Sequence, residues 1–180
     1  MQHIVIDTEG VRLTPLSATD LSLLADLHAD PAVHRYLSSA HGAWSLDKVS
    51  TFLDDTLADQ ERHGLSAFKV TDENNTFLGW AGFSPLEETS EIAMRWCFSK
   101  DARAKHSDLT LKVSRELIDW FFENTYFSHI VVPVRTDDRN ARSTVQDLGF
   151  VYRESRRIED MPCDVFQLLS PSLRSYLVSA

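Results

Sequence analysis

The chain has 180 residues, a length that fits one domain of typical size and is short for two independent ones. Hydrophobic residues make up 43% of the sequence and charged residues 25%, which is ordinary for a globular protein and excludes a disordered or fibrous class. Twenty-seven acidic side chains against 18 basic ones give a net charge of −9. This charge opposes non-specific binding to nucleic acid, because such binding depends on neutralising phosphates.

The N-terminal part is predicted to hold a strand followed by helices. Its first residues lack the basic and apolar stretches of a secretory signal. Val11 to Pro15 alternates apolar and polar residues and predicts a strand. Ser17, with Asp20 three residues later, predicts the capped start of a helix. A short helix is expected from Val33 to Leu37, and a longer one is expected to begin after Ser45.

The rest of the chain is predicted to alternate strands with helices. The expected strands are Ser66–Thr71, Thr76–Phe83, Glu91–Phe98, His129–Val134, Phe150–Glu154 and Met161–Leu169, and the expected helices are Asp108–Glu123 and Arg139–Asp147. The helix after the strand at Glu91–Phe98 predicts a crossover between two parallel strands. No apolar stretch approaches the roughly 20 residues that a bilayer span needs, so no membrane anchor is expected. Without repeats or linkers, residues 1–180 are predicted to form a single domain.

The cysteines and the motif survey exclude several kinds of site. Cys97 and Cys163 are too few for a disulfide framework and lie among apolar residues, which predicts two small buried side chains. No cluster of histidine, cysteine and acidic residues has the spacing of a metal site, and neither a P-loop nor a Gly-x-Ser-x-Gly motif is present. We therefore expect a cytoplasmic protein without a bound metal.

Three local sequences are informative together with the order of the elements: Thr8–Leu16 with Asp30–Leu37, Phe77–Phe83, and Asn140–Ser143 followed by Leu148–Phe150. They resemble the GNAT superfamily of N-acetyltransferases, in particular the branch that acetylates the N-termini of ribosomal proteins. The resemblance covers nearly the full chain. It implies a mixed α/β fold with a central sheet of six to seven strands flanked by helices, and acetyl-CoA as co-substrate. A homodimer is also compatible with it, although no feature of the sequence demands one.

The resemblance assigns the cofactor to two neighbouring segments. Trp96, Cys97 and Phe98 would line the pantetheine arm, although an ordinary core strand explains the same residue types. The pyrophosphate would bind a loop that includes Arg103, Lys105, His106, Ser107 and Asp108. Family members carry glycine at the position of His106 and glycine or alanine at the position of Asp108, because the backbone approaches the phosphate closely there. An imidazole would crowd that approach and an aspartate would repel the anion, whereas the Arg103 and Lys105 side chains could bind it in place of amides.

The chemistry of transfer is assigned to three further residues. By resemblance, Asn140 binds near the cofactor arm, and Ser143, one helical turn later, protonates the leaving thiolate. The alternatives are that Asp138 or Asn140 only caps the helix and that Ser143 is a solvated helix residue. Glu91 is a candidate general base, and an exposed glutamate paired with Arg95 is the alternative.

Two functions follow from these assignments. One is an N-acyltransferase that acetylates the primary amine of a peptide N-terminus, an amino acid or a small molecule, with the acceptor bound near Val33 to Trp44. The other is a GNAT-like binding module that has lost coenzyme A binding. The sequence of the loop from Arg103 to Asp108 separates the two hypotheses.

Overall fold

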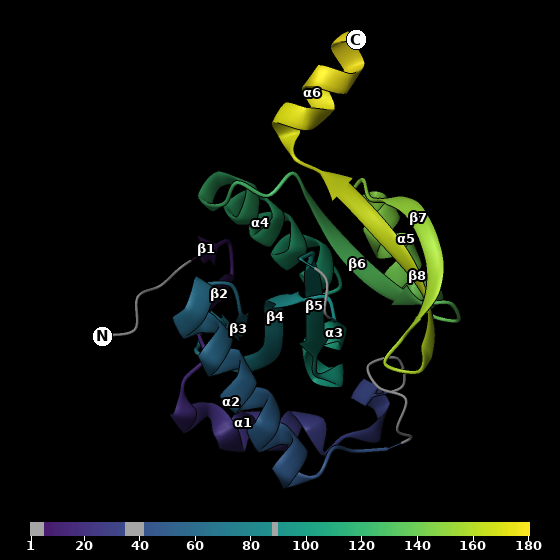
Figure 1. The fold of residues 1–180 in the computed structure, drawn as a ribbon. Coiled ribbons are helices and arrows are strands. Elements are labelled where there is room, and N and C mark those ends of the chain that lie inside the picture. Colours follow the sequence, from purple (N-terminus) through teal and green to yellow (C-terminus); the bar gives the residue numbers. More distant parts are fainter. Residues whose placement is uncertain (1–5, 35–41, 88–89) are drawn as a thin grey trace. The chain divides into compact units, whose positions relative to one another are not determined.

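The computed structural model describes residues 6–34, 42–87 and 90–180, and Figure 1 shows the path of the chain. It clusters into two compact units. The first takes the described residues up to Ser84 together with Arg95–Leu109, and the second takes Pro85–Met94 and Thr110–Ala180. The strand order is β1-β2-β3-β4-β5-β6-β8-β7, and β5 (Ile92–Phe98) contributes residues to both units. A mixed α/β fold is therefore confirmed, and its sheet has eight strands among the described residues rather than the six to seven expected.

The first unit combines an antiparallel sheet with three helices. Its elements are β1 (Ile6–Thr8), β2 (Val11–Pro15), η1 (Ala18–Asp20), α1 (Leu21–His28), η2 (Pro31–His34), α2 (Leu46–His63), β3 (Ala67–Asp72), most of β4 (Phe77–Pro85), and α3 (Lys100–Lys105). β1 to β4 pair with their neighbours in antiparallel register. Ser17 N donates to Asp20 Oδ2 at 2.9 Å, and Ser45 Oγ accepts from Lys48 N at 3.2 Å, so both predicted helix starts are confirmed.

The core of the first unit lies between α1, α2 and the sheet. Its buried cluster consists of Leu16, Leu24, Leu27, Val49, Leu53, Ala67, Trp80 and Cys97. Strand β4 passes unusually close to its neighbours because two of its residues are glycines. A Cβ on Gly79, whose φ is +147°, would lie 2.1 Å from the carbonyl oxygen of Cys97, and a Cβ on Gly82 would lie 2.3 Å from that of Ser66. Only glycine fits these positions.

The second unit contains a three-stranded antiparallel ribbon and a parallel pair. Its elements are β6 (His129–Arg135), α5 (Arg139–Asp147), β7 (Val151–Ile158), β8 (Met161–Leu169), α6 (Pro171–Ser179), and α4 (Leu109–Asn124), whose first residue belongs to the other unit. Ala93 of β5 pairs with Val131 of β6 in parallel, so the predicted parallel pair around a helix is confirmed. β8 pairs antiparallel with both β6 and β7.

Several elements differ from the predictions. β1 is only three residues long and carries no detectable pattern, although Gly10, with φ +78°, marks the turn that follows it. β7 continues to Ile158, beyond the predicted end at Glu154. The prediction was too short because β7 is an edge strand, and its charged side chains hide the alternation of apolar and polar residues. α6, which ends the chain in Figure 1, was not predicted, and none of its residues is buried. No described helix is long and apolar enough to cross a membrane. The predicted helix at Val33 to Leu37 begins as η2, and residues 35–41 lie outside the described part.

Candidate functional site

The segment Trp96, Cys97 and Phe98 forms the C-terminal end of β5 in the first unit. Cys97 is buried in the core cluster, and burial raises the pKa of its thiol to about 12, against the opposing charge of Arg103. A thiol with that pKa stays protonated at neutral pH and is a poor nucleophile. Cys163 is also buried, so the prediction of two small buried side chains is confirmed. Trp96 is half-buried, whereas Phe98 is buried.

The predicted pyrophosphate loop is helical in its first half, which corrects the sequence analysis. α3 is capped by Ser99, whose Oγ accepts from Ala102 N at 3.1 Å. The amide of Arg103 donates to Ser99 O, and that of His106 donates to Ala102 O. The capping serine at position 99 is the sequence signal that predicts this helix. These two amides are therefore unavailable to a phosphate.

The side chains of this segment carry the charge that its amides do not offer. Arg103 and Lys105 lie in the last turn of α3, are exposed, and form no ion pair among the described residues. His106 is half-buried, whereas Ser107 and Asp108 are exposed. The two free cations fit a pyrophosphate as side-chain ligands.

Asp72 places an opposing charge close to this segment. Backbone N–H bonds from Thr76 and Asn74 lower the pKa of the Asp72 carboxyl, and the charge of His106 contributes to the same shift. The His106 ring is therefore within electrostatic reach of a carboxylate.

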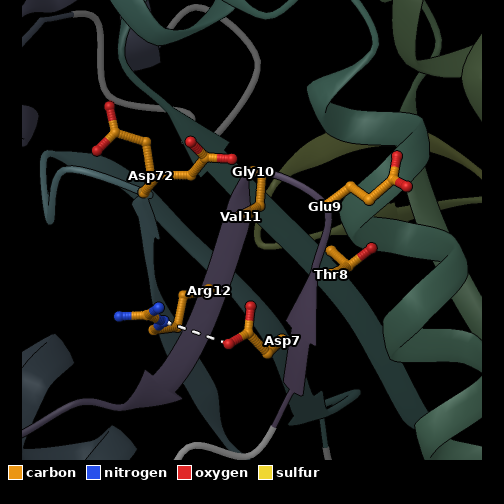
Figure 2. Close-up of a pocket in the computed structure, with 8 residues that line it drawn as sticks. Asp7, Thr8, Glu9, Gly10, Val11, Arg12 and Asp72 are labelled. Atoms are coloured by element: carbon orange, nitrogen blue, oxygen red, sulfur yellow. Dashed lines mark ion pairs between the residues drawn. The ribbon is translucent and has the colours of Figure 1, made fainter.

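A cavity of about 410 Å³ lies beside β1, β2 and the turn after β3. Figure 2 shows its lining, which consists of Asp7, Thr8, Glu9, Gly10, Val11, Arg12, Asp72 and Glu73. Arg12 Nε pairs with Asp7 Oδ2 at 3.5 Å. Four carboxylates against one paired guanidinium make this cavity unsuited to a phosphate. None of the predicted site residues lines it.

Asn140 and Ser143 lie on α5 of the second unit, and both are exposed. Asp138 caps the helix, since its Oδ1 accepts from Ala141 N at 3.0 Å. The structural alternative for Asp138 is therefore confirmed, and Asn140 is free of that role. Thr144 Oγ1 donates to Asn140 O at 2.9 Å. The two side chains are accessible to a ligand, as the predicted roles require.

Glu91, just before β5, has a different partner from the one expected. Arg153 donates to both of its carboxylate oxygens, at 2.9 and 3.0 Å, and His129 Nε2 lies 3.7 Å from Oε1. Arg95 forms no ion pair in the part of the chain that the structure describes, so the expected pairing with Arg95 is wrong. Burial alone would raise the pKa of Glu91, but the donors and charge of Arg153 lower it. A carboxylate held in its charged form is a weaker base.

A second ionic network fixes α5 on its unit, and the sequence analysis did not find it. Asp164 of β8 is 7% exposed and accepts from Arg142 of α5 and from Ser155 of β7. The guanidinium carbon of Arg142 also lies 5.4 Å from the centroid of the Phe166 ring. A lone aspartate in an otherwise apolar strand is the one sequence signal for this contact.

A buried cluster of histidine and tryptophan in the first unit was also missed. His28 is fully buried, its ring stacks on Trp44 at 4.3 Å between centroids, and its Nε2 accepts from Trp80 Nε1 at 3.1 Å. His28 Nδ1 lies 3.2 Å from His34 Nε2. The histidine at the end of the apolar stripe of α1 is the signal that could have revealed it.

The structure thus groups the predicted residues by unit. In the first, Cys97 and Arg103 are electrostatically coupled; in the second, Asn140 and Ser143 share α5, while Glu91 belongs to a separate ion pair. Among residues 6–34, 42–87 and 90–180, no group of three histidine, cysteine or acidic side chains could hold a metal.

Comparison with known proteins gives one family and many similar folds. The model of the acetyltransferase (GNAT) domain matches residues 11–151. No curated protein matches the sequence. An acetyltransferase from Agrobacterium tumefaciens is 20% identical, covers 91% of this chain and 92% of its own, and has a TM-score of 0.76.

Two further solved structures are ribosomal-protein acetyltransferases. RimL, the ribosomal L7/L12 alpha-N-protein acetyltransferase in complex with coenzyme A, is 10% identical over 93% of this chain and 98% of its own, with a TM-score of 0.78. The ribosomal-protein-S5-alanine acetyltransferase from Vibrio fischeri is 13% identical over 92% and 96%, with a TM-score of 0.74. At these identities the likeness concerns the fold.

Proposed function

Because the chain belongs to the GNAT acetyltransferase domain family, we propose that it is an N-acyltransferase that moves an acetyl group from acetyl-CoA to a primary amine. The observation that carries the proposal is the family match over residues 11–151, a span that includes β5, α3 and α5. The proposed acceptor is a peptide N-terminus, an amino acid or a small-molecule amine. Similarity in fold to two ribosomal-protein acetyltransferases favours a peptide N-terminus among these.

The first unit would hold the co-substrate. The exposed Arg103 and Lys105 side chains are the proposed ligands of the pyrophosphate, with His106, Ser107 and Asp108 beside them. Trp96, Cys97 and Phe98 are proposed to line the pantetheine arm, Trp96 with its half-buried ring. When bound, acetyl-CoA supplies an acyl group already activated as a thioester.

The proposed proton chemistry rests on helix α5. Ser143 is the proposed acid, because an exposed hydroxyl can donate its proton to a leaving thiolate. Asn140, three residues earlier on α5, would bind the cofactor arm through its amide. The ion pair with Arg153 weakens the case for Glu91 as base, and its base role stays a prediction. A cytoplasmic location and a homodimer stay predictions as well.

The alternative function is a GNAT-like module that no longer binds coenzyme A. One observation favours it, namely that the amides of Arg103 and His106 are engaged in helical hydrogen bonds. In that case Arg103 and Lys105 would be ordinary surface cations. Binding of acetyl-CoA distinguishes the two functions directly.

The first experiment is a thermal shift with acetyl-CoA. Specific binding should stabilise the protein by RT ln(1 + [L]/Kd), about 2.7 kcal/mol at a hundredfold excess over Kd. Arg103→Ala and Lys105→Ala should each weaken binding about tenfold, because each removes one charge-assisted contact to phosphate. Lys100→Ala removes an exposed cation from the first turn of the same helix and is the matched control. No shift at millimolar acetyl-CoA would contradict the proposal.

Turnover is measured separately, as release of free thiol from acetyl-CoA in the presence of peptide, amino-acid and polyamine acceptors. Binding together with acceptor-dependent release supports acyl transfer. Binding without release from any acceptor supports a module that retains the cofactor without catalysis. If the protein neither binds acetyl-CoA nor releases thiol, the result supports the alternative function.

A further inference from the structure

Helix α5, which carries Asn140 and Ser143, has few apolar contacts to hold it in place. It is nine residues long, and Val145 is its one buried side chain. Isolated helices shorter than about 12 to 15 residues are marginal in water, so this helix depends on contacts to its unit. A single buried valine holds a helix at one point and leaves its rotation about its own axis weakly determined.

Arg142 provides the second point of attachment. It donates to Asp164 Oδ2, and Ser155 donates to Asp164 Oδ1. Because both carboxylate oxygens are engaged by different elements, the Asp164 carboxylate has one orientation, and the direction of the Arg142 side chain follows from it. The Phe166 ring, which packs against the guanidinium at 5.4 Å, limits its movement further.

The position of Arg142 on the helix makes this attachment relevant to Ser143. Arg142 and Val145 are three residues apart and lie on the same side of α5. Ser143 follows Arg142 directly, about 100° further around the axis, and is exposed. Rotation of the helix about its axis would move the Ser143 hydroxyl along an arc, and the Arg142–Asp164 ion pair opposes that rotation.

We propose that Arg142 and Asp164 are positioning residues, which aim the Ser143 hydroxyl by fixing the rotation of α5. The inference rests on the proposed function, in which Ser143 protonates the leaving thiolate. A general acid contributes only at hydrogen-bond distance from the atom it protonates. Misplacement by about 1 Å can cost on the order of a hundredfold in rate.

The charged pair also suits positioning better than it suits stability. Asp164 is buried, but the Arg142 side chain is 35% exposed, and an ion pair that is partly open to solvent adds little to stability. An apolar contact has no preferred direction. A guanidinium bound to an oriented carboxylate does have one.

The test is a double-mutant cycle on turnover. Arg142→Ala should lower kcat about ten- to a hundredfold and change the KM for acetyl-CoA less, because Asn140 is the one proposed cofactor ligand on α5 and the proposed pyrophosphate ligands lie elsewhere. If Arg142 acts through Ser143, Arg142→Ala should lower kcat no further once Ser143 is alanine. Asp164→Asn should lower kcat as Arg142→Ala does. Gln146→Ala, at an exposed position of the same helix, is the matched control and should leave kcat unchanged.

Amide hydrogen exchange supplies a readout that does not depend on turnover. Exchange over residues 139–147 should accelerate in Arg142→Ala and Asp164→Asn and stay unchanged in Ser143→Ala and Gln146→Ala. Arg142→Lys, which keeps the charge but not the planar fork, should fall between wild type and alanine in both measurements. This variant also keeps the test decisive if the alanine variant fails to fold.

The outcomes separate this inference from the proposed function. A wild-type protein that neither binds acetyl-CoA nor releases thiol overturns both. A wild-type protein that turns over, with effects of Arg142→Ala and Ser143→Ala that multiply in the double variant, overturns only the positioning role. Unchanged exchange in α5 after loss of Asp164 has the same consequence.

Discussion

Two polar clusters, one in each unit, differ in charge: one is neutral and the other is an ion pair. In the first unit His28 is fully buried, and its two ring nitrogens contact Trp80 and His34, neither of which is acidic. In the second, Glu91 and Arg153 are each about one-quarter exposed and form a bidentate ion pair. Burial without an opposite charge favours the neutral form, whereas an opposite charge at hydrogen-bond distance favours the charged form. The two clusters should therefore respond differently to mutation and pH.

The hydrogen bonds around His28 account for its neutrality. Trp80 Nε1 can only donate, so His28 Nε2 must accept and the proton of His28 lies on Nδ1. His28 Nδ1 lies 3.2 Å from His34 Nε2, which also lies 3.1 Å from the carbonyl oxygen of His28, an atom that can only accept. A second proton on His28 would replace the acceptor that Trp80 needs. Burial first, and the neighbouring His34 second, lower the pKa of His28 to about 3.

The largest expected effect comes from removing the His28 ring. His28→Ala should lower the free energy of unfolding by about 3–5 kcal/mol, because it leaves a cavity beside Trp44 and an unpaired N–H on Trp80. The measurement is urea denaturation at pH 7. His63→Ala removes an exposed histidine whose Nδ1 accepts from Leu65 N at 3.3 Å, and it should change stability by less than about 1 kcal/mol. Equal effects of the two variants would contradict the cluster.

A smaller effect is expected from pH in the unmodified protein. The folded pKa of His28, about 3, lies below its ordinary value of 6.5, so its contribution is complete above pH 6.5 and is lost as the pH falls towards 3. Between pH 6.5 and 5 the loss should be about 2 kcal/mol. Carboxylates stay ionised in both states over most of this window, so the histidines dominate the slope.

The same pH series on two variants isolates His28. His28→Gln should have a flatter slope than the wild type between pH 6.5 and 5, whereas His63→Gln should keep it. A slope that His28→Gln does not change would show that His28 is not protonated preferentially in the unfolded state.

The comparison also explains what the sequence could predict. α5 and β8 have the predicted bounds because local signals define them: Asp138 caps the helix, and the strand Met161–Leu169 is mostly apolar. The partners of Glu91 and His28 lie 62 and 52 residues away, and a single sequence carries no signal for such pairs. The parallel pairing of β5 with β6 was predictable since a helix separates the two strands.

The segment after β5 shows how a family resemblance can mislead locally. Alignment placed a loop at Arg103 to Asp108, whereas Ser99 starts a helix that runs to Lys105. The residues themselves favoured the helix, since a serine cap followed by Lys-Asp-Ala-Arg-Ala-Lys has high helix propensity. Local propensity was the better guide where the glycines of the family are absent.

The smallest expected effect on stability concerns Glu91, and it decides a catalytic question. Glu91→Gln removes one charge of a partly exposed ion pair, so the free energy of unfolding should fall by less than about 1 kcal/mol, and by less still at high salt. If Glu91 were the general base, kcat should fall by about 10² to 10⁴. We expect less than a tenfold fall, because Arg153 holds this carboxylate in its charged form and lowers its pKa. Glu154→Gln, which removes the other carboxylate bound to Arg153, is the matched control. A fall in kcat of a hundredfold or more in Glu91→Gln alone would restore Glu91 as the base and make Arg153 the residue that tunes it.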